Sequence, residues 1–144
     1  RALKTSFHFW RSERSLNSLH QRAEELIDAV GLGDYLDLSA VELSYGRKRA
    51  LEIATTLALE PEMLLLDEPM AGLGHEDIGR ISDLIRRVSR NRTVLMVEHN
   101  MNVVAELSDH ITVLQRGEIL AEGPYEMVSK NPQVIEAYVG TGHA

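Results

Sequence analysis

Two carboxylates follow directly on a short apolar run near the middle of the chain. In the stretch MLLLDEP, residues 63–69, Asp67 and Glu68 come immediately after four apolar residues. In open α/β sheets the ligand binds beyond the carboxyl ends of the strands, so a strand here would place both acids at such a site. An aspartate there can hold Mg²⁺, and a glutamate can orient or deprotonate a water molecule that attacks a phosphate. The alternative is a strand end at which the two acids are simply solvated.

The segments that would position these acids alternate between helical and strand patterns. Apolar residues recur at helical spacing in three segments, 16–30, 44–60 and 78–88. Two short continuous apolar runs, 63–66 and 93–97, predict strands that are covered on both faces. The order of these elements predicts an α/β fold.

The C-terminal third of the chain predicts shorter elements. A short helical stretch covers residues 101–107, and alternating residues on either side of Arg116 and Gly117 predict a hairpin over 111–122. Two short helices follow, divided at Asn131 and Pro132. No internal repeat and no low-complexity tract interrupts this order.

Composition narrows the class of protein. The chain has 144 residues, of which 44% are hydrophobic, and a formal net charge of −7, which fits one soluble globular domain. Residues 51–144 hold seven Lys and Arg against fifteen Asp and Glu, which argues against a nucleic-acid partner. The absence of cysteine excludes disulfides and thiolate metal sites. No apolar run approaches the roughly 20 residues of a membrane span.

Four motifs surround the two acids in a fixed order. LSYGR (43–47) is followed by MLLLDEP, then by MAGLG (70–74), and then by His99 after MVE. This order resembles the ABC transporter ATPase family, in which these would be the signature motif, the Walker B motif, the D-loop and the switch histidine. The resemblance covers residues 16–140. Within it, the short motifs LSYG, EHNM, AEG and NPQVIEAYVG resemble those of the ATP-binding subunits of branched-chain amino acid importers.

The resemblance implies a role for each matching residue. Asp67 would hold Mg²⁺ and Glu68 would be the catalytic base, while His99 would donate to the γ-phosphate of ATP. The signature residues Ser44, Tyr45, Gly46 and Arg47, at a helix N-terminus, would bind the phosphates of an ATP molecule held by a second, head-to-tail subunit. Gly74, in the D-loop, would also belong to the nucleotide site. From the residues alone, Ser44 is equally an ordinary helix N-cap and His99 an ordinary, partly exposed polar residue.

Three features depart from the family pattern. Tyr45 and Arg47 replace the commoner Gly and Gln of the signature, and Arg47 would add a cation near the phosphate site. Gly74 stands where the D-loop often carries an aspartate. The third departure is larger, because no Gly-Lys pair exists in the sequence, so the G-x-x-x-x-G-K-[ST] phosphate loop is absent. We therefore expect the chain to be the C-terminal portion of a longer subunit.

The implied fold is a partial P-loop NTPase-like ABC ATPase fold. Residues 1–60 would form the helical subdomain, and residues 61–144 would form the C-terminal part of the RecA-like nucleotide-binding core. The basic and aromatic N-terminal stretch, residues 1–15, would be a connector or a docking segment for the membrane partner. The stretch resembles neither a repeat nor a signal peptide.

Two functions from different classes follow. The first is the ATP-hydrolysing subunit of an importer, bound to integral membrane permease subunits at the cytoplasmic face of the inner membrane and soluble when isolated. The second is a non-catalytic binding or regulatory module derived from such an ATPase. An ABC ATPase for a different solute is a variant of the first.

Overall fold

The computed structural model describes residues 13–139. The N-terminal stretch that we predict to be a connector or a docking segment, residues 1–15, lies almost entirely outside this range. The described chain divides into two compact units, the first ending at Val97 and the second beginning at Glu98. The boundary that we predict between residues 60 and 61 remains a prediction about the family's subdomains.

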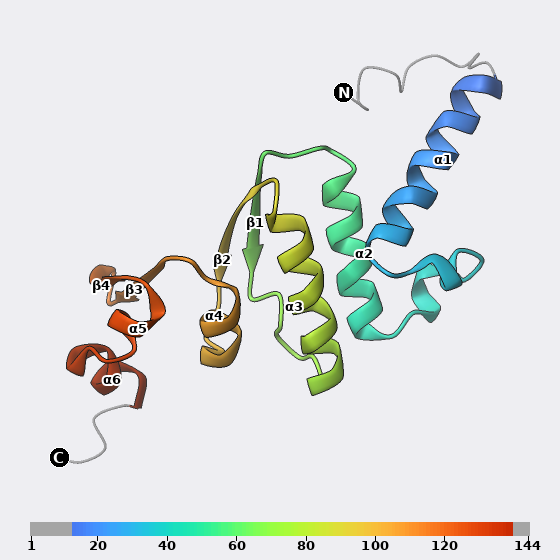
Figure 1. The fold of residues 1–144 in the computed structure, drawn as a ribbon. Coiled ribbons are helices and arrows are strands. Elements are labelled where there is room, and N and C mark those ends of the chain that lie inside the picture. Colours follow the sequence, from blue (N-terminus) through green and yellow to red (C-terminus); the bar gives the residue numbers. More distant parts are fainter. Residues whose placement is uncertain (1–12, 140–144) are drawn as a thin grey trace. The chain divides into compact units, whose positions relative to one another are not determined.

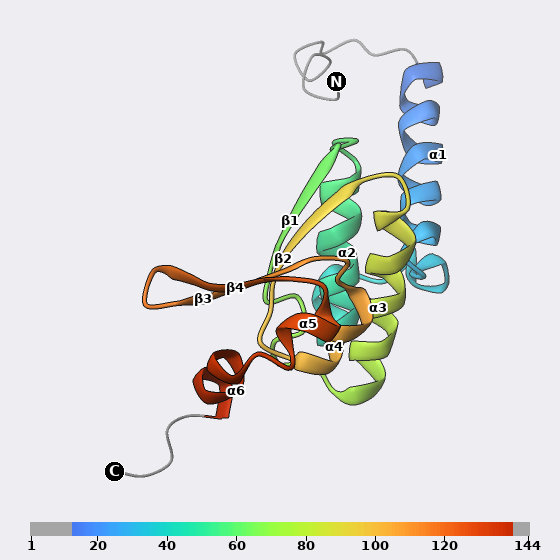
Figure 2. The same ribbon diagram turned by 60° about the vertical axis from the view of Figure 1, so that its left-hand side comes forward.

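The first unit contains three helices and a parallel pair of strands. Helix α1 (Glu13–Ala29) is followed by two short 3-10 turns, η2 (Gly33–Tyr35) and η3 (Ala40–Glu42), and by α2 (Tyr45–Leu57). Strand β1 (Met63–Asp67), helix α3 (His75–Ser89) and strand β2 (Thr93–Val97) complete it. Figures 1 and 2 show α2 and α3 together on one side of the strand pair.

The two strands pair in parallel, as the predicted order of elements requires. Met63 lies opposite Thr93 and Asp67 opposite Val97, with no irregularity between them. Helix α3 forms the crossover, and its apolar residues Ile81, Leu84 and Ile85 are buried. Parallel strands need such a crossover, because a tight turn joins only antiparallel strands.

The prediction that both strands are buried on both faces is wrong for this chain. Leu64 points toward the helices and is 1% exposed, whereas the next residue, Leu65, is 71% exposed. Met63, Leu95 and Val97 share the exposed face with Leu65. A continuous apolar run indicates that both faces suit burial, but the described residues cover only one of them. The four exposed residues are called the open sheet face below.

The second unit is built on a hairpin and three short helices. Helix α4 (Met101–Leu107) precedes the antiparallel strands β3 (Ile111–Gln115) and β4 (Glu118–Gly123), and α5 (Tyr125–Val128) and α6 (Pro132–Val139) follow. The turn at Arg116 and Gly117 has positive φ at both residues, the conformation that favours tight hairpins. The predicted hairpin and both predicted C-terminal helices are confirmed.

The hairpin forms a sheet of its own. Among the described residues, β1 pairs only with β2 and β3 only with β4. One edge of β2 therefore has no neighbouring strand within the part of the chain that the structure describes. No helix in that part is long and apolar enough to cross a bilayer.

Candidate functional site

Asp67 and Glu68 lie at the carboxyl end of β1, as predicted. Asp67 is the last residue of the strand and lies opposite Val97 of β2. The amide of Glu68 donates to the carbonyl oxygen of Val97 over 2.9 Å, which extends the ladder one residue further. Glu68 then adopts φ +41°, a left-handed conformation that is uncommon for a residue with a side chain. The chain thus turns directly after Asp67, and both carboxylates remain exposed at the end of the sheet.

A cleft of about 180 Å³ lies beside Asp67. Its walls come from one face of α2, with Arg49, Glu52 and Thr56, and from the end of β1 and Pro69. Arg49 forms an ion pair of 2.8 Å with Glu52, while its buried Nε has no hydrogen-bond partner. The cleft is therefore lined by two carboxylates, those of Glu52 and Asp67, and by one cation, Arg49, which is paired with Glu52.

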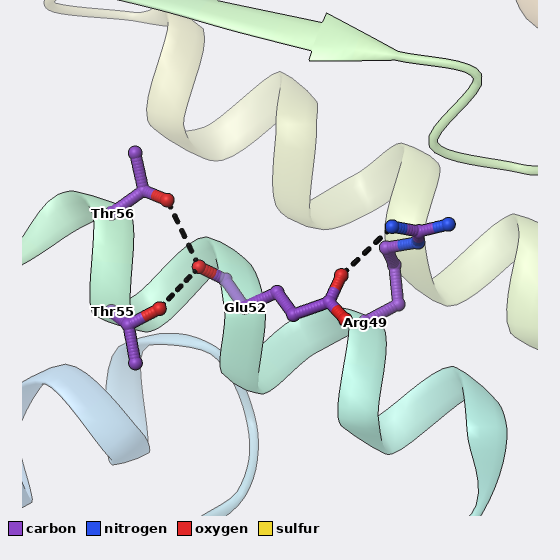
Figure 3. Close-up of polar contacts among 4 residues, drawn as sticks. All are labelled: Arg49, Glu52, Thr55 and Thr56. Carbon is purple, nitrogen blue, oxygen red and sulfur yellow. Dashed lines mark hydrogen bonds and ion pairs between the residues drawn. The ribbon is translucent and has the colours of Figure 1, made fainter.

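The backbone of α2 is anchored beside this cleft at Glu52. The hydroxyl groups of Thr55 and Thr56 both donate to the Glu52 carbonyl oxygen, over 2.7 and 3.0 Å, as Figure 3 shows. The same figure shows the Glu52 carboxylate reaching Arg49 one turn earlier. These contacts fix Arg49 on the face of α2 that borders the cleft.

The signature motif forms the N-terminal end of α2. Ser44 is the N-cap residue, but its side chain makes no capping hydrogen bond, and it is exposed. The amide groups of the first turn point out of the helix without intrahelical partners, and the helix dipole adds partial positive charge there. The exposed Ser44 hydroxyl and this helix end can therefore receive an anion.

Two other predicted site residues have different surroundings. The Arg47 guanidinium lies 4.1 Å from the centre of the Tyr35 ring, so it stacks on the η2 turn of its own chain. Gly74 is the N-cap of α3 and lies in open space, where it supplies no side-chain cap. Neither observation tests their predicted roles at a nucleotide.

Through Tyr45 and Gly46, the N-terminal end of α2 contacts residues that follow Glu68 in the sequence. A Cβ atom placed on Gly72 would lie 3.4 Å from the Tyr45 ring, which means that the ring rests on this glycine. A Cβ atom placed on Gly46 would lie 2.5 and 2.6 Å from the two carboxylate oxygens of Asp77. The signature motif and the loop after Glu68 are thus neighbours within one chain.

His99 belongs to the second unit, where its backbone is well fixed. The Glu98 carboxylate accepts from the amides of His99 and Asn100, over 3.0 and 3.1 Å. The Asn100 side chain then caps α4 by accepting from Asn102 and Val103. The His99 side chain is exposed, and its donation to a γ-phosphate stays a prediction.

The acidic groups fit a magnesium ion that is shared with a nucleotide. Within residues 13–139 no group of three His, Cys, Asp or Glu residues gathers at one point. Mg²⁺ keeps several waters and is usually held by one or two carboxylates together with substrate phosphates. Asp67 meets that requirement, whereas a cation cage made entirely of protein does not exist in this part of the chain.

Sequence reasoning missed Arg49 and Asp77. Arg49 is one of three consecutive basic residues, which gives no indication of which one borders the cleft. Asp77 had a weak signal, because an acidic residue in the first turn of a helix is expected on electrostatic grounds alone. Its contact with Gly46 depends on how α2 and α3 cross.

Comparisons with known proteins agree with this geometry. Residues 3–71 match the family model described as ABC transporter, and residues 118–144 match the one described as branched-chain amino acid ATP-binding cassette transporter. The high-affinity branched-chain amino acid transport ATP-binding protein BraF of Pseudomonas aeruginosa is 40% identical over 92% of this chain and 51% of its own length. LivG of Escherichia coli, which carries the same description, is 39% identical over 88% of this chain and 51% of its own length. The chain therefore spans about half the length of these curated relatives.

Solved structures show the same fold. The ADP conformation of MJ1267, an ATP-binding cassette of an ABC transporter, matches 96% of this chain and 55% of its own with a TM-score of 0.79 and 28% identity. The fold of cbiO1 from Clostridium perfringens is also similar, with a TM-score of 0.75 over 92% of this chain and 52% of that one. Motif order, strand register, family matches and fold agree, and this chain belongs to the family of ABC transporter ATP-binding domains.

Proposed function

We propose that this chain is the C-terminal half of an ATP-hydrolysing importer subunit whose transport substrates are branched-chain amino acids. The observation that carries the proposal is the pair Asp67 and Glu68 at the end of β1, with the signature helix α2 beside the loop that follows them. BraF and LivG are branched-chain amino acid transport ATP-binding proteins, which supports this class of solute. Their length and the open sheet face support a longer subunit, because about half of each relative lies outside the match.

In this proposal each site residue has one task. Asp67 holds Mg²⁺, which neutralises charge on the ATP phosphates when it is bound. Glu68 takes a proton from the attacking water, and its backbone is held by the hydrogen bond to Val97. His99 donates to the γ-phosphate. Ser44 and the amide of Gly46 receive phosphates of a nucleotide that a second subunit holds. Tyr45, Arg47 and Gly74 belong to the same nucleotide site.

The proposal also assigns partners and a location. Two such subunits would associate head to tail, because the signature end of one completes the nucleotide site of the other. The pair would bind integral membrane permease subunits at the cytoplasmic face of the inner membrane. No nucleic acid is involved, in keeping with the acidic charge of the C-terminal region.

A second candidate is favoured by one specific observation. The sequence contains no Gly-Lys pair and hence no phosphate loop, so the chain by itself would be a non-catalytic binding module. We therefore expect the purified chain to show no magnesium-dependent ATP turnover, whereas ordinary enzymes turn over at about 1 per second or faster. Turnover at that level by the chain alone would contradict the role given to the missing loop.

The decisive experiment uses the longer subunit encoded by the same gene. Glu68→Gln should lower ATP hydrolysis by about a hundredfold or more while ATP still binds, because the amide is not a base. Glu62→Gln is the matched control, since it makes the same chemical change in an exposed residue just before the other end of β1. Equal activity of the two variants would remove Glu68 from the catalytic role. Absence of hydrolysis in the unmodified subunit would favour the binding module.

A further inference from the structure

Asp77 occupies the space in which a side chain at residue 46 would otherwise lie. Both of its carboxylate oxygens come within 2.6 Å of the position of a Cβ atom on Gly46, well inside normal contact distance. Gly46 is buried, and a larger residue there would clash with this carboxylate unless Asp77 moved. The space beside the α-carbon of Gly46 is therefore taken by Asp77, and the Gly46 amide keeps the role proposed for it.

The Asp77 carboxylate lies at the positive ends of two helices. It belongs to the first turn of α3 and touches the first turn of α2, so both helix dipoles favour its negative charge. Arg80 holds it from the side, with Nη1 at 3.2 Å from Oδ1, and its other nitrogen is bound to Glu76 at 2.9 Å. One short side chain thus joins the starts of α2 and α3.

A second contact joins α2 to the loop between β1 and α3, residues 68–74. The Tyr45 ring rests on Gly72, whose φ of +74° is the left-handed conformation that glycine adopts without strain. Two hydrogen bonds tighten this loop, from the Ala71 amide to the Glu68 carbonyl over 3.0 Å and from the Leu73 amide to the Met70 carbonyl over 3.2 Å. Gly72 is thus the chain neighbour of Ala71, whose amide is bonded to the Glu68 carbonyl.

We propose that Asp77 is a positioning residue that, together with Tyr45, couples the anion-receiving end of α2 to the loop that begins at Glu68. This inference rests on the proposed function, because it gives Ser44 and Glu68 the roles stated there. When a phosphate is bound at Ser44, the two contacts carry the position of α2 to Glu68. A subunit whose signature end is empty leaves its own Glu68 less well placed.

The test compares Asp77→Asn with Asp83→Asn in the longer subunit. The two aspartates lie on the same helix and each pairs with an arginine three residues later, over 3.2 Å and 2.7 Å. Asp77 lies against Gly46 of α2, whereas the Asp83 side chain is 64% exposed. We expect Asp77→Asn to lower kcat by roughly tenfold to a hundredfold with little change in ATP affinity, because misplacement of a catalytic group by about 1 Å costs that much. Asp83→Asn should leave both unchanged.

Hydrogen exchange gives a readout that does not depend on activity. In the isolated chain, Asp77→Asn and Tyr45→Leu should each speed exchange of the Ala71 and Leu73 amides, which bond within the loop, whereas Asp83→Asn should not. Unchanged exchange and unchanged kcat in the Asp77 variant would overturn the coupling. If the unmodified subunit failed to hydrolyse ATP while exchange responded as expected, the contact would stand and the proposed function would fail. A variant that lowered stability without changing the loop amides would show a packing role only, and would also overturn the proposal.

Discussion

The clearest test of the strand pair is a comparison of two neighbouring leucines on β1. Leu64 is 1% exposed and packs toward α2 and α3, whereas Leu65 is 71% exposed on the open sheet face. Leu64→Ala and Leu65→Ala remove the same atoms from adjacent positions of one strand. The loss of intrinsic strand preference is therefore shared, and only burial differs.

The expected costs differ several-fold. Leu64→Ala removes a fully buried side chain and leaves a cavity, which costs about 2–5 kcal/mol of unfolding free energy. Full burial of a leucine is worth about 1.5–3 kcal/mol, so the small buried fraction of Leu65 limits its loss to about 0.5–1 kcal/mol. If the unfolding free energy falls by about 2 kcal/mol per molar urea, the unfolding midpoint should fall by about 1–2.5 M for Leu64→Ala and by less than about 0.5 M for Leu65→Ala.

Urea unfolding of the isolated chain, followed by far-UV circular dichroism at constant protein concentration, measures both shifts. Equal shifts for the two variants would refute the assignment of Leu64 and Leu65 to opposite faces. In the longer subunit that we propose, the cost of Leu65→Ala should rise to about 2–5 kcal/mol, because the rest of that subunit would cover the open sheet face. A harmless Leu65→Ala in the longer subunit would show that this face stays open.

Two further predictions follow from the described contacts. Gly46→Ala should lower the unfolding free energy by about 1 kcal/mol or more relative to Gly79→Ala, because Asp77 fills the space beside the α-carbon of Gly46 while the exposed Gly79 has open space there. In an Asp77→Ala background this difference should largely vanish. If urea titrations showed that the difference persists, Asp77 would not be the cause. The isolated chain should self-associate through the open sheet face and the unpaired edge of β2. Leu95→Lys should therefore shift its sedimentation toward that of the monomer, whereas the control Glu118→Lys should not. An unmodified chain that stays strictly monomeric at high concentration would contradict this prediction.

The order of elements is predictable from the sequence because it rests on local spacing. The predicted strand 93–97 and helix 101–107 agree with β2 and α4, and the predicted helix starting near Ser44 begins one residue later. The turn at Arg116 and Gly117 is predictable from glycine chemistry. The positions of Asp67 and Glu68 are likewise predictable, because they follow one strand and ligands bind at the carboxyl ends of parallel strands.

The rest depends on contacts between segments that the sequence does not pair. The residues MLLLD do not show which face of the strand the rest of the chain covers. The prediction of burial is therefore right for Leu64 and wrong for Leu65. The position of Ser44 is that of an N-cap, yet its hydroxyl makes no capping bond. Arg47 is predicted as a cation near a phosphate, and its stacking on Tyr35 requires a turn that sequence spacing does not show.

The parallel register of β1 and β2 also determines when the carboxylate pair is assembled during folding. Each paired residue lies 30 positions from its partner, from Met63 and Thr93 to Asp67 and Val97. Such distant pairing is slow to form because closing the intervening loop costs chain entropy before any contact is gained. Helix α3 shortens that loop as it forms, so we expect the strands to pair after α3 has formed. The hairpin of β3 and β4 has no such dependence, since its turn is local. We therefore expect Asp67 and Glu68 to gain their native geometry later than the helices of the first unit, whose contacts are local.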